Sequence, residues 1–274
     1  MKSNNIDKKV VNDFGNEWDR FQQTDITYDA WNQYFHIFPF NEISNTSIGF
    51  DMGCGSGRWA TFLHDKVGLL NCIDPSDKAL DVARKNLSMA NNIKFIEASV
   101  GEKNILEDAS QDFGYCLGVL HHVPDTAAGI KSCGKLLKRG APFLLYLYYN
   151  FENKPLFYRA IWRISDFIRR IISTLPHPIK VLCAELIAFV VYIPFSKLAY
   201  FLEKFGINVS NVPLSDYRNK SLHFIRTDSL DRFGTRLEQR FSKREIKKML
   251  LDAGFSEPEF SNGTPYWVCL TRKL

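Results

Sequence analysis

Short, continuous apolar runs alternate with amphipathic stretches between residues 47 and 150. Short apolar runs lie at 48–52, 69–73, 93–98, 114–120 and 142–149, and such runs predict buried strands. The stretches near 58–65, 76–89 and 127–137 place apolar residues on one helical face, which predicts helices. Strands that are apolar throughout are typical of a parallel sheet with helices on both faces. The pattern therefore predicts an α/β fold.

This alternation stops at Asn150. Residues 151–226 predict helices around 156–172 and 179–192, punctuated by Pro176, Pro178 and Pro194. Ser242 and Glu245 have capping-box spacing, which predicts a helix over 243–253 that Gly254 ends. Short strands are expected near 257–261 and 266–271. We therefore expect a core at 47–150, a helical insertion at 151–226 after the fifth strand, and a segment at 227–274 that completes the core.

The first 46 residues are rich in aromatic side chains. The spacing of Phe14, Trp18 and Phe21 places three rings on one helical face. Such a stripe either docks on the core or forms a lid over a ligand. We treat residues 1–46 as a helical lid, in which Trp18 and Phe21 would contact the substrate.

Charge is distributed unevenly along the chain of 274 residues. The net charge is +5, but residues 151–226 contain eleven Lys or Arg and five Asp or Glu, so that segment is +6 and the rest is −1. A charge confined to one segment does not predict a nucleic-acid interface. The six cysteines show no C-x-x-C spacing, which favours reduced thiols, and the amino-terminal residues do not resemble a signal peptide. We expect a cytoplasmic protein.

The inserted segment combines apolar and basic positions. Residues 156–172 alternate isoleucines with arginines, a basic amphipathic pattern compatible with a membrane surface or a lipid-like acceptor. The apolar run at 181–195 is shorter than the roughly 20 residues of a membrane span. Three interpretations remain for residues 156–200: a buried cap over the substrate, peripheral membrane contact, and an interface between subunits.

The stretch IGFDMGCGSGRWA at 48–60 contains the most informative chemistry. Gly53, Gly55 and Gly57 follow the first predicted strand, at the sheet edge where such folds bind ligands. The spacing Gly55-x-Gly57-x-x-Ala60 also fits a dinucleotide fingerprint, and Asp74, 19 residues after Gly55, can accept hydrogen bonds from a ribose. These residues predict a nucleoside-type cofactor, and NAD is one of the cofactors that they allow.

A longer set of motifs resembles the class I S-adenosylmethionine-dependent methyltransferases that act on small molecules. These motifs, in chain order, are Asp51-x-Gly53-x-Gly55-x-Gly57, Ile73-Asp74-Pro75-Ser76, the segment 112–125 with Leu-His-His-Val, Leu136 to Gly140, and Phe241 to Phe255. The resemblance implies a Rossmann-like, doubly wound, seven-stranded mixed sheet. The carboxylate of Asp51 agrees with it, because a carboxylate before the loop repels a pyrophosphate and attracts a sulfonium or ammonium.

The resemblance also implies the cofactor contacts. The glycine loop would border the methionyl part, Asp74 the ribose, and the residues after the third strand the adenine. Ser99 departs from the family, which more often has an acidic residue there. The implied S-adenosylmethionine-binding residues are Asp51, Gly53, Cys54, Gly55, Gly57, Asp74, Pro75, Ala98, Ser99, Val100 and Gly118.

Methyl transfer to a hydroxyl needs a base, and histidine is suited to that at neutral pH. His122, and after it His121, follow the fourth predicted strand. Their alternative role is packing, because the family often has histidines there that do not act in catalysis. Tyr149 and Tyr266 are candidate walls of the substrate pocket.

Arg232, Arg236 and Arg240 recur every four residues. On a helix they would form a row suited to a carboxylate or phosphate of the substrate. Gly234 weakens the prediction of a helix there, and a solvated face paired with nearby acids is the alternative.

The sequence thus predicts a cytoplasmic methyltransferase without metal. It would transfer a methyl group from S-adenosylmethionine to an oxygen or nitrogen of a small organic acceptor, apolar or anionic. The alternatives are an NAD-dependent oxidoreductase and a catalytically silent protein that keeps the fold for binding.

Overall fold

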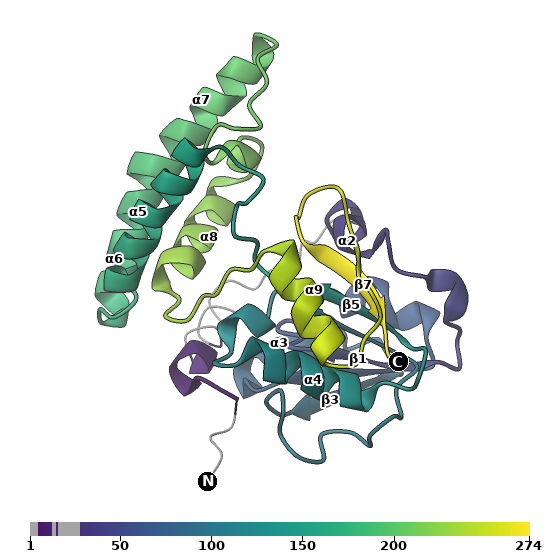
Figure 1. Ribbon diagram of the computed structural model, residues 1–274. Helices are drawn as coiled ribbons and strands as arrows, with labels where there is room; N and C mark the ends of the chain where they lie inside the picture. Colours follow the sequence, from purple (N-terminus) through teal and green to yellow (C-terminus); the bar gives the residue numbers. More distant parts are fainter. Residues whose placement is uncertain (1–4, 13–14, 16–27) are drawn as a thin grey trace. The chain divides into compact units, whose positions relative to one another are not determined.

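The computed structural model describes residues 5–12, 15 and 28–274 (Figure 1). The chain divides into two compact units. The first comprises residues 1–150 and 237–274, and the second comprises residues 151–236. The insertion therefore extends to Arg236, further than the boundary at 226 that the sequence suggested.

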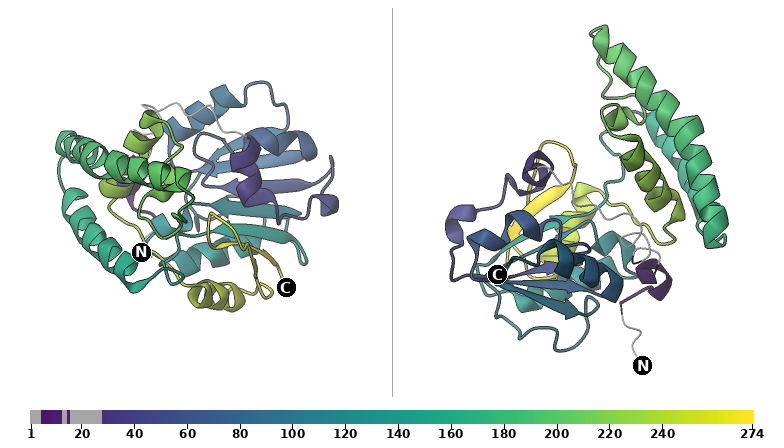
Figure 2. Two further views of the ribbon diagram at one scale, coloured as in Figure 1. Left: turned by 90° about the horizontal axis from the view of Figure 1, so that it is seen from above. Right: turned by 180° about the vertical axis from the view of Figure 1, so that it is seen from behind.

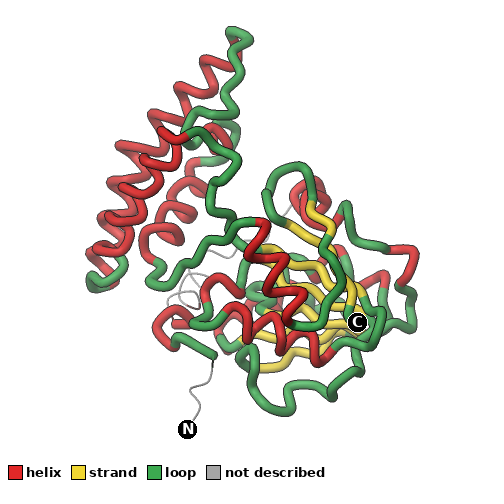
Figure 3. The backbone as a smooth tube through the Cα atoms, in the orientation of Figure 1, coloured by secondary structure: helices red, strands yellow, loops and turns green. Residues whose placement is uncertain are grey.

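A mixed sheet of seven strands organises the first unit. Its order is β3-β2-β1-β4-β5-β7-β6, with β1 to β5 parallel and β7 antiparallel to both of its neighbours. Figure 3 shows the strands of this sheet in yellow. This confirms the predicted doubly wound sheet. The strands are β1 (Ile48–Met52), β2 (Leu69–Asp74), β3 (Ile93–Glu97), β4 (Phe113–Leu117), β5 (Pro142–Tyr146), β6 (Glu259–Phe260) and β7 (Val268–Arg272).

Apolar side chains cover both faces of this sheet. Successive residues of β5 point to opposite faces, so Phe143 packs in one buried cluster and Leu144 in the other. The helices α4 (Thr126–Leu136) and α9 (Lys243–Asp252) contribute to the first cluster. The helices α2 (Tyr28–Phe35) and α3 (Asp77–Asn86) contribute to the second. Burial on both faces explains why the strands read as continuous apolar runs.

The helix expected at 58–65 does not form. Two short 3₁₀ turns, Ala60–Phe62 and His64–Lys66, take its place. Trp59, Ala60 and Leu63 are all buried in one cluster. Over so short a segment this packing outweighs helix propensity, because nucleating a helix is costly. The predicted helical conformation was therefore wrong.

The aromatic segment is described only in part. Trp31 and Phe35 of α2 are buried and stacked, with ring centroids 4.7 Å apart and planes at 9°, so this part docks on the core. The stripe of Phe14, Trp18 and Phe21 lies outside the described residues, and its role as a lid stays a prediction.

The second unit is helical. It contains α5 (Leu156–Ile172), α6 (His177–Ile187), a π-helical turn (Ala188–Tyr192), α7 (Ile193–Lys204), a 3₁₀ turn (Ser215–Tyr217) and α8 (Leu222–Gly234). Figure 2 shows α6, the π-turn and α7 as one continuous helix. The break expected at Pro194 was wrong, since the proline lies in the first turn of α7 and the wider π-turn before it accommodates the missing N–H.

Candidate active site

The loop after β1 is built around glycines. The amides of Gly53 and Cys54 donate to the carbonyl of Ile73, at 2.7 and 3.0 Å. Gly53 has a φ of +78°, and a Cβ there would lie 2.4 Å from Val119 Cγ2. A side chain is therefore excluded by both backbone conformation and space, and the loop packs closely at the carboxyl edge of the sheet.

Asp74 ends β2 and holds this loop. Its carboxylate accepts the amide of Gly55 and the amide of Ser76, both at 2.9 Å. Burial raises the pKa of Asp74 to about 6, against the lowering effect of these two hydrogen bonds. Each carboxylate oxygen has further lone pairs, so Asp74 can hold the loop and accept a ribose hydroxyl at the same time. The expected ribose contact remains a prediction.

Asp51 is a buried carboxyl beneath the same loop. It is 1% exposed, and neither oxygen has a hydrogen bond of ordinary geometry to any described residue. Burial raises the pKa of Asp51 to about 8, with a smaller raising effect of Asp74 and lowering effects of the Tyr115 hydroxyl and Arg58. A buried, unsatisfied carboxyl is costly unless a donor or a cation completes it. The site therefore fits a ligand with an ammonium or sulfonium group.

The remaining predicted cofactor residues follow β3 and β4. Ala98, Ser99 and Val100 are buried, and the Ser99 amide donates to Glu102 Oε2 at 3.0 Å. Gly118 has a φ of +81°, and its amide donates to the carbonyl of Tyr146 at 3.2 Å. Because β1 to β4 are parallel neighbours, these segments meet at one edge of the sheet with the glycine loop.

The two histidines after β4 have different surroundings. His122 Nδ1 lies 2.7 Å from the carbonyl oxygen of Leu237. A carbonyl only accepts, so Nδ1 carries the proton and the neutral ring has its lone pair on Nε2. Both nitrogens of His121 are buried without a hydrogen bond to the described residues. Burial, followed by the charges of His122 and Arg240, holds the pKa of His121 well below its usual range.

Aromatic rings extend from the glycine loop to these histidines. Neighbouring rings have centroids 3.7 to 5.9 Å apart, in the order Trp59, Tyr34, Tyr146, Tyr148 and His121. The predicted substrate residues Tyr149 and Tyr266 lie together in a second pair, at 5.1 Å. The structure thus brings aromatic surface to the sheet edge that bears the histidines.

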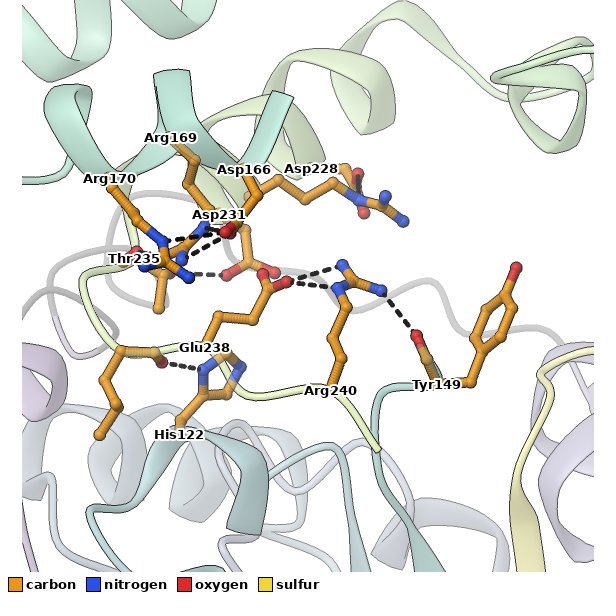
Figure 4. A network of polar contacts seen from close by, with 12 residues as sticks. His122, Tyr149, Asp166, Arg169, Arg170, Asp228, Asp231, Thr235, Glu238 and Arg240 are labelled. Atoms are coloured by element: carbon orange, nitrogen blue, oxygen red, sulfur yellow. Dashed lines mark hydrogen bonds and ion pairs between the residues drawn. The ribbon is translucent and has the colours of Figure 1, made fainter. Parts of the chain in front are cut away.

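The segment that follows the second unit completes this region, and the sequence did not reveal it. In the lower part of Figure 4, Arg240 binds Glu238 at 2.7 Å and donates to the carbonyl of Tyr149 at 3.3 Å. Gln239 donates to the carbonyl oxygens of His121 and Val123, at 2.9 and 2.7 Å. Neither Glu238 nor Gln239 matches a motif, so only the fold shows that Gln239 holds the histidine turn and that Glu238 holds Arg240.

The predicted arginine row does not exist. Helix α8 ends at Gly234, so Arg236 and Arg240 do not continue its face. Arg232 is paired with Asp228 at 2.9 Å, and Arg240 with Glu238. Glycine disfavours continuing a helix, and pairing with nearby acids is the alternative that the sequence left open. Arg232 and Arg236 therefore do not share a helical face, and the prediction of an anion-binding row was wrong.

Comparisons with known proteins agree with this geometry. Residues 50–145 match the family described as "Methyltransferase domain". A ubiquinone biosynthesis O-methyltransferase of Nitrosospira multiformis is 26% identical over 153 residues, which cover 49% of this chain and 63% of that protein. One from Nitrosomonas europaea is 25% identical over 187 residues, covering 63% and 77%.

A solved structure shares the fold. A Thermotoga maritima protein, described as a "SAM-dependent methyltransferase, possible histamine N-methyltransferase", has a TM-score of 0.52 at 16% identity, covering 96% of this chain and 98% of that one. The Thermotoga structure shows the same class I, Rossmann-like fold. The match over residues 50–145 identifies the core as an S-adenosylmethionine-dependent methyltransferase domain, with S-adenosylmethionine as the cofactor. The chain spans less than two thirds of the length of the Nitrosospira relative.

Proposed function

We propose that the protein transfers a methyl group from S-adenosylmethionine to a hydroxyl oxygen of an apolar, aromatic small molecule. The observation that carries this proposal is the row of aromatic rings that joins the glycine loop to the histidine pair. Relatives named O-methyltransferases support oxygen as the acceptor atom. Aromatic walls favour a flat, apolar acceptor, because rings pack well against rings.

The cofactor, when bound, supplies a methyl carbon activated by the sulfonium. The chain would hold it with Asp51, Asp74 and the loop around Gly55, and would place the acceptor by its aromatic rings. Alignment of this kind contributes up to roughly 7–11 kcal/mol to such reactions. The enzyme's main task is therefore positioning and the exclusion of water.

A base is required because a hydroxyl keeps its proton at neutral pH. We assign this role to His122 at Nε2, with Nδ1 held by the carbonyl of Leu237. His121 has a lowered pKa and stacks on Tyr148 at 3.7 Å, so we assign it to packing beside the base. An arylamine has a free lone pair at neutral pH and can attack without such a base, so the oriented ring of His122 favours a hydroxyl over an arylamine as the acceptor.

Matched probe acceptors test this proposal. We would incubate the protein with methyl-labelled S-adenosylmethionine and, separately, a dodecyl-substituted catechol, unsubstituted catechol and a dodecyl-substituted aniline. We expect label in the first product above all, with less in unsubstituted catechol. Label only in the aniline would overturn the choice of oxygen. No label in any probe or in a lipid extract, despite bound cofactor, would favour the catalytically silent alternative.

A further inference from the structure

Helix α5 of the second unit turns Asp166 and Arg169 inward and most of its large apolar side chains outward. Arg169 is 6% exposed, binds Asp166 at 2.8 Å and donates to the carbonyl of Thr235 at 2.9 Å (upper part of Figure 4). Ile164 and Phe167 of the same helix are 64% and 65% exposed. This is the reverse of a helix on a water-soluble domain, where apolar side chains face the core.

The continuous helix 177–204 repeats this inversion. Lys180 is 8% exposed and donates to the carbonyl of Gly234 at 3.3 Å, and Glu185 pairs with Arg226 at 2.7 Å. Leu182 and Val190 are 60% and 68% exposed. By length and composition the helix is apolar enough to cross a membrane, yet only 28% of its most apolar window is buried. A core helix of a soluble domain would be mostly buried.

The exposed apolar surface is concentrated in this unit. Elsewhere among the described residues, the large apolar side chains that are exposed are Tyr28, Met89, Leu251 and Leu274. Contiguous apolar surface of this extent indicates an interaction site. We define the apolar face of the second unit as its exposed large apolar residues outside α8, which are Leu156, Phe157, Ile161, Ile164, Phe167, Ile168, Ile171, Ile179, Leu182, Leu186, Phe189, Val190, Val191, Phe195, Leu198, Phe201, Phe205 and Ile207.

Charge decides between a second copy of the chain and a lipid bilayer. Residues 151–236 contain thirteen Lys or Arg and seven Asp or Glu, so the unit carries +6. Arg163, Arg170, Lys197 and Lys204 are exposed on the two helices that bear the apolar face. Two such units would repel each other, whereas an anionic bilayer attracts basic residues that flank inserted apolar ones.

We propose that the apolar face of the second unit inserts into the surface of an anionic lipid bilayer. Both α5 and α6 pack on α8, so their apolar sides point away from it. Helix α8 carries Arg226, Asp228 and Arg232, which form ion pairs and belong on the aqueous side. The unit therefore lies on the membrane and does not span it. This inference does not depend on the identity of the methyl acceptor. Membrane binding would bring the enzyme and the proposed apolar acceptor to one surface.

Vesicle flotation with the full-length protein tests the proposal. The vesicles are phosphatidylcholine alone, or phosphatidylcholine with phosphatidylglycerol at a ratio of seven to three. We expect binding to the anionic vesicles that weakens as salt is raised. The double variant Phe167→Gln with Val190→Gln should bind at least about tenfold more weakly, and Arg163→Gln about fivefold more weakly to anionic vesicles only.

The matched control replaces exposed apolar residues of the first unit, Met89→Gln with Leu251→Gln, and should bind as the parent does. Circular dichroism and affinity for S-adenosylhomocysteine verify that each variant is folded. Because neither they nor flotation depend on the acceptor, a failure of membrane binding can be told apart from a failure of the proposed methyl transfer. A parent protein that ignores both vesicles would overturn the proposal. So would a dimer in solution that the Phe167 and Val190 variant dissociates while vesicle binding is unchanged.

Discussion

At the scale of single residues, the most consequential group is the carboxyl of Asp51. The sequence predicted its role, because an acid directly before three alternating glycines is hard to reconcile with a pyrophosphate. The structure adds that both oxygens are buried without an ordinary hydrogen bond to the described residues and that its pKa is raised to about 8. The carboxyl is therefore mostly protonated at pH 7 before a cation arrives.

This protonation makes cofactor binding depend on pH. The ammonium of the cofactor should favour the ionised carboxylate, so binding at pH 7 should release about one proton. Affinity for S-adenosylhomocysteine should then increase with pH, up to about tenfold per unit, until about pH 8. Calorimetry in buffers of different ionisation enthalpy measures the released proton. Asp51→Asn should abolish the release, and an unchanged release in that variant would contradict the assignment.

The histidine pair yields a second prediction at this scale. His122→Ala should lower kcat about a hundredfold with the dodecyl-substituted catechol, because the hydroxyl proton loses its acceptor. The Kd for S-adenosylhomocysteine should not change. His121→Phe preserves a ring beside Tyr148 and should lower kcat far less. Normal turnover in His122→Ala would remove this residue from the mechanism.

Sequence reasoning reached these residues unevenly. The motif residues Asp51, Asp74 and His122 could be proposed from the sequence because their spacing along the chain carries the signal. Leu237 and Gln239 were missed because their contacts with the histidine turn join segments about 115 residues apart, which no local pattern reveals. The arginine row failed for the opposite reason, since a four-residue spacing implies a shared face only while a helix continues.

At the scale of elements, the strands were predicted to within a few residues and the short helix at 58–65 was not. Strands buried on both faces leave an unbroken apolar run, and capping residues mark helix starts such as Ser76 and Ser242. Residues 58–65 contain Trp59, Ala60 and Leu63 at spacings that suit both an α-helix and 3₁₀ turns. Contacts with the sheet decide between the α-helix and the 3₁₀ turns, and the local sequence does not show those contacts.

The inverted helix α5 allows a stability prediction at this scale. Arg169 and Arg170 both bind Asp166, but the Arg169 side chain is 7% exposed and that of Arg170 is 70% exposed. Removing a buried partner leaves a buried charge, so Arg169→Ala should lower the free energy of unfolding by about 3 kcal/mol. Arg170→Ala should lower it by less than about 1 kcal/mol. Hydrogen exchange of the α8 amides measures both changes in the free energy of unfolding. Equal effects of the two substitutions would contradict the inward position of Arg169.

At the scale of the whole molecule, the chain combines two units with opposite surfaces. The first buries its apolar residues around a sheet and carries a net charge near −1, whereas the second exposes apolar residues and carries +6. Charge segregation was visible in the sequence. The inward direction of Arg169 and Lys180 was not, because an amphipathic pattern shows that a helix has two faces without showing which one packs.

The most direct test of the central claim, that the loop after β1 binds S-adenosylmethionine, is a calorimetric titration of the protein with S-adenosylhomocysteine and with NAD. We expect S-adenosylhomocysteine to bind and NAD to give no heat. Gly55→Val places a branched side chain where φ is +54° and where the amide donates to Asp74. The loop should therefore change its conformation and the variant should lose the binding, while the rest of the protein stays folded. Binding of NAD without S-adenosylhomocysteine, or full affinity in Gly55→Val, would contradict the claim.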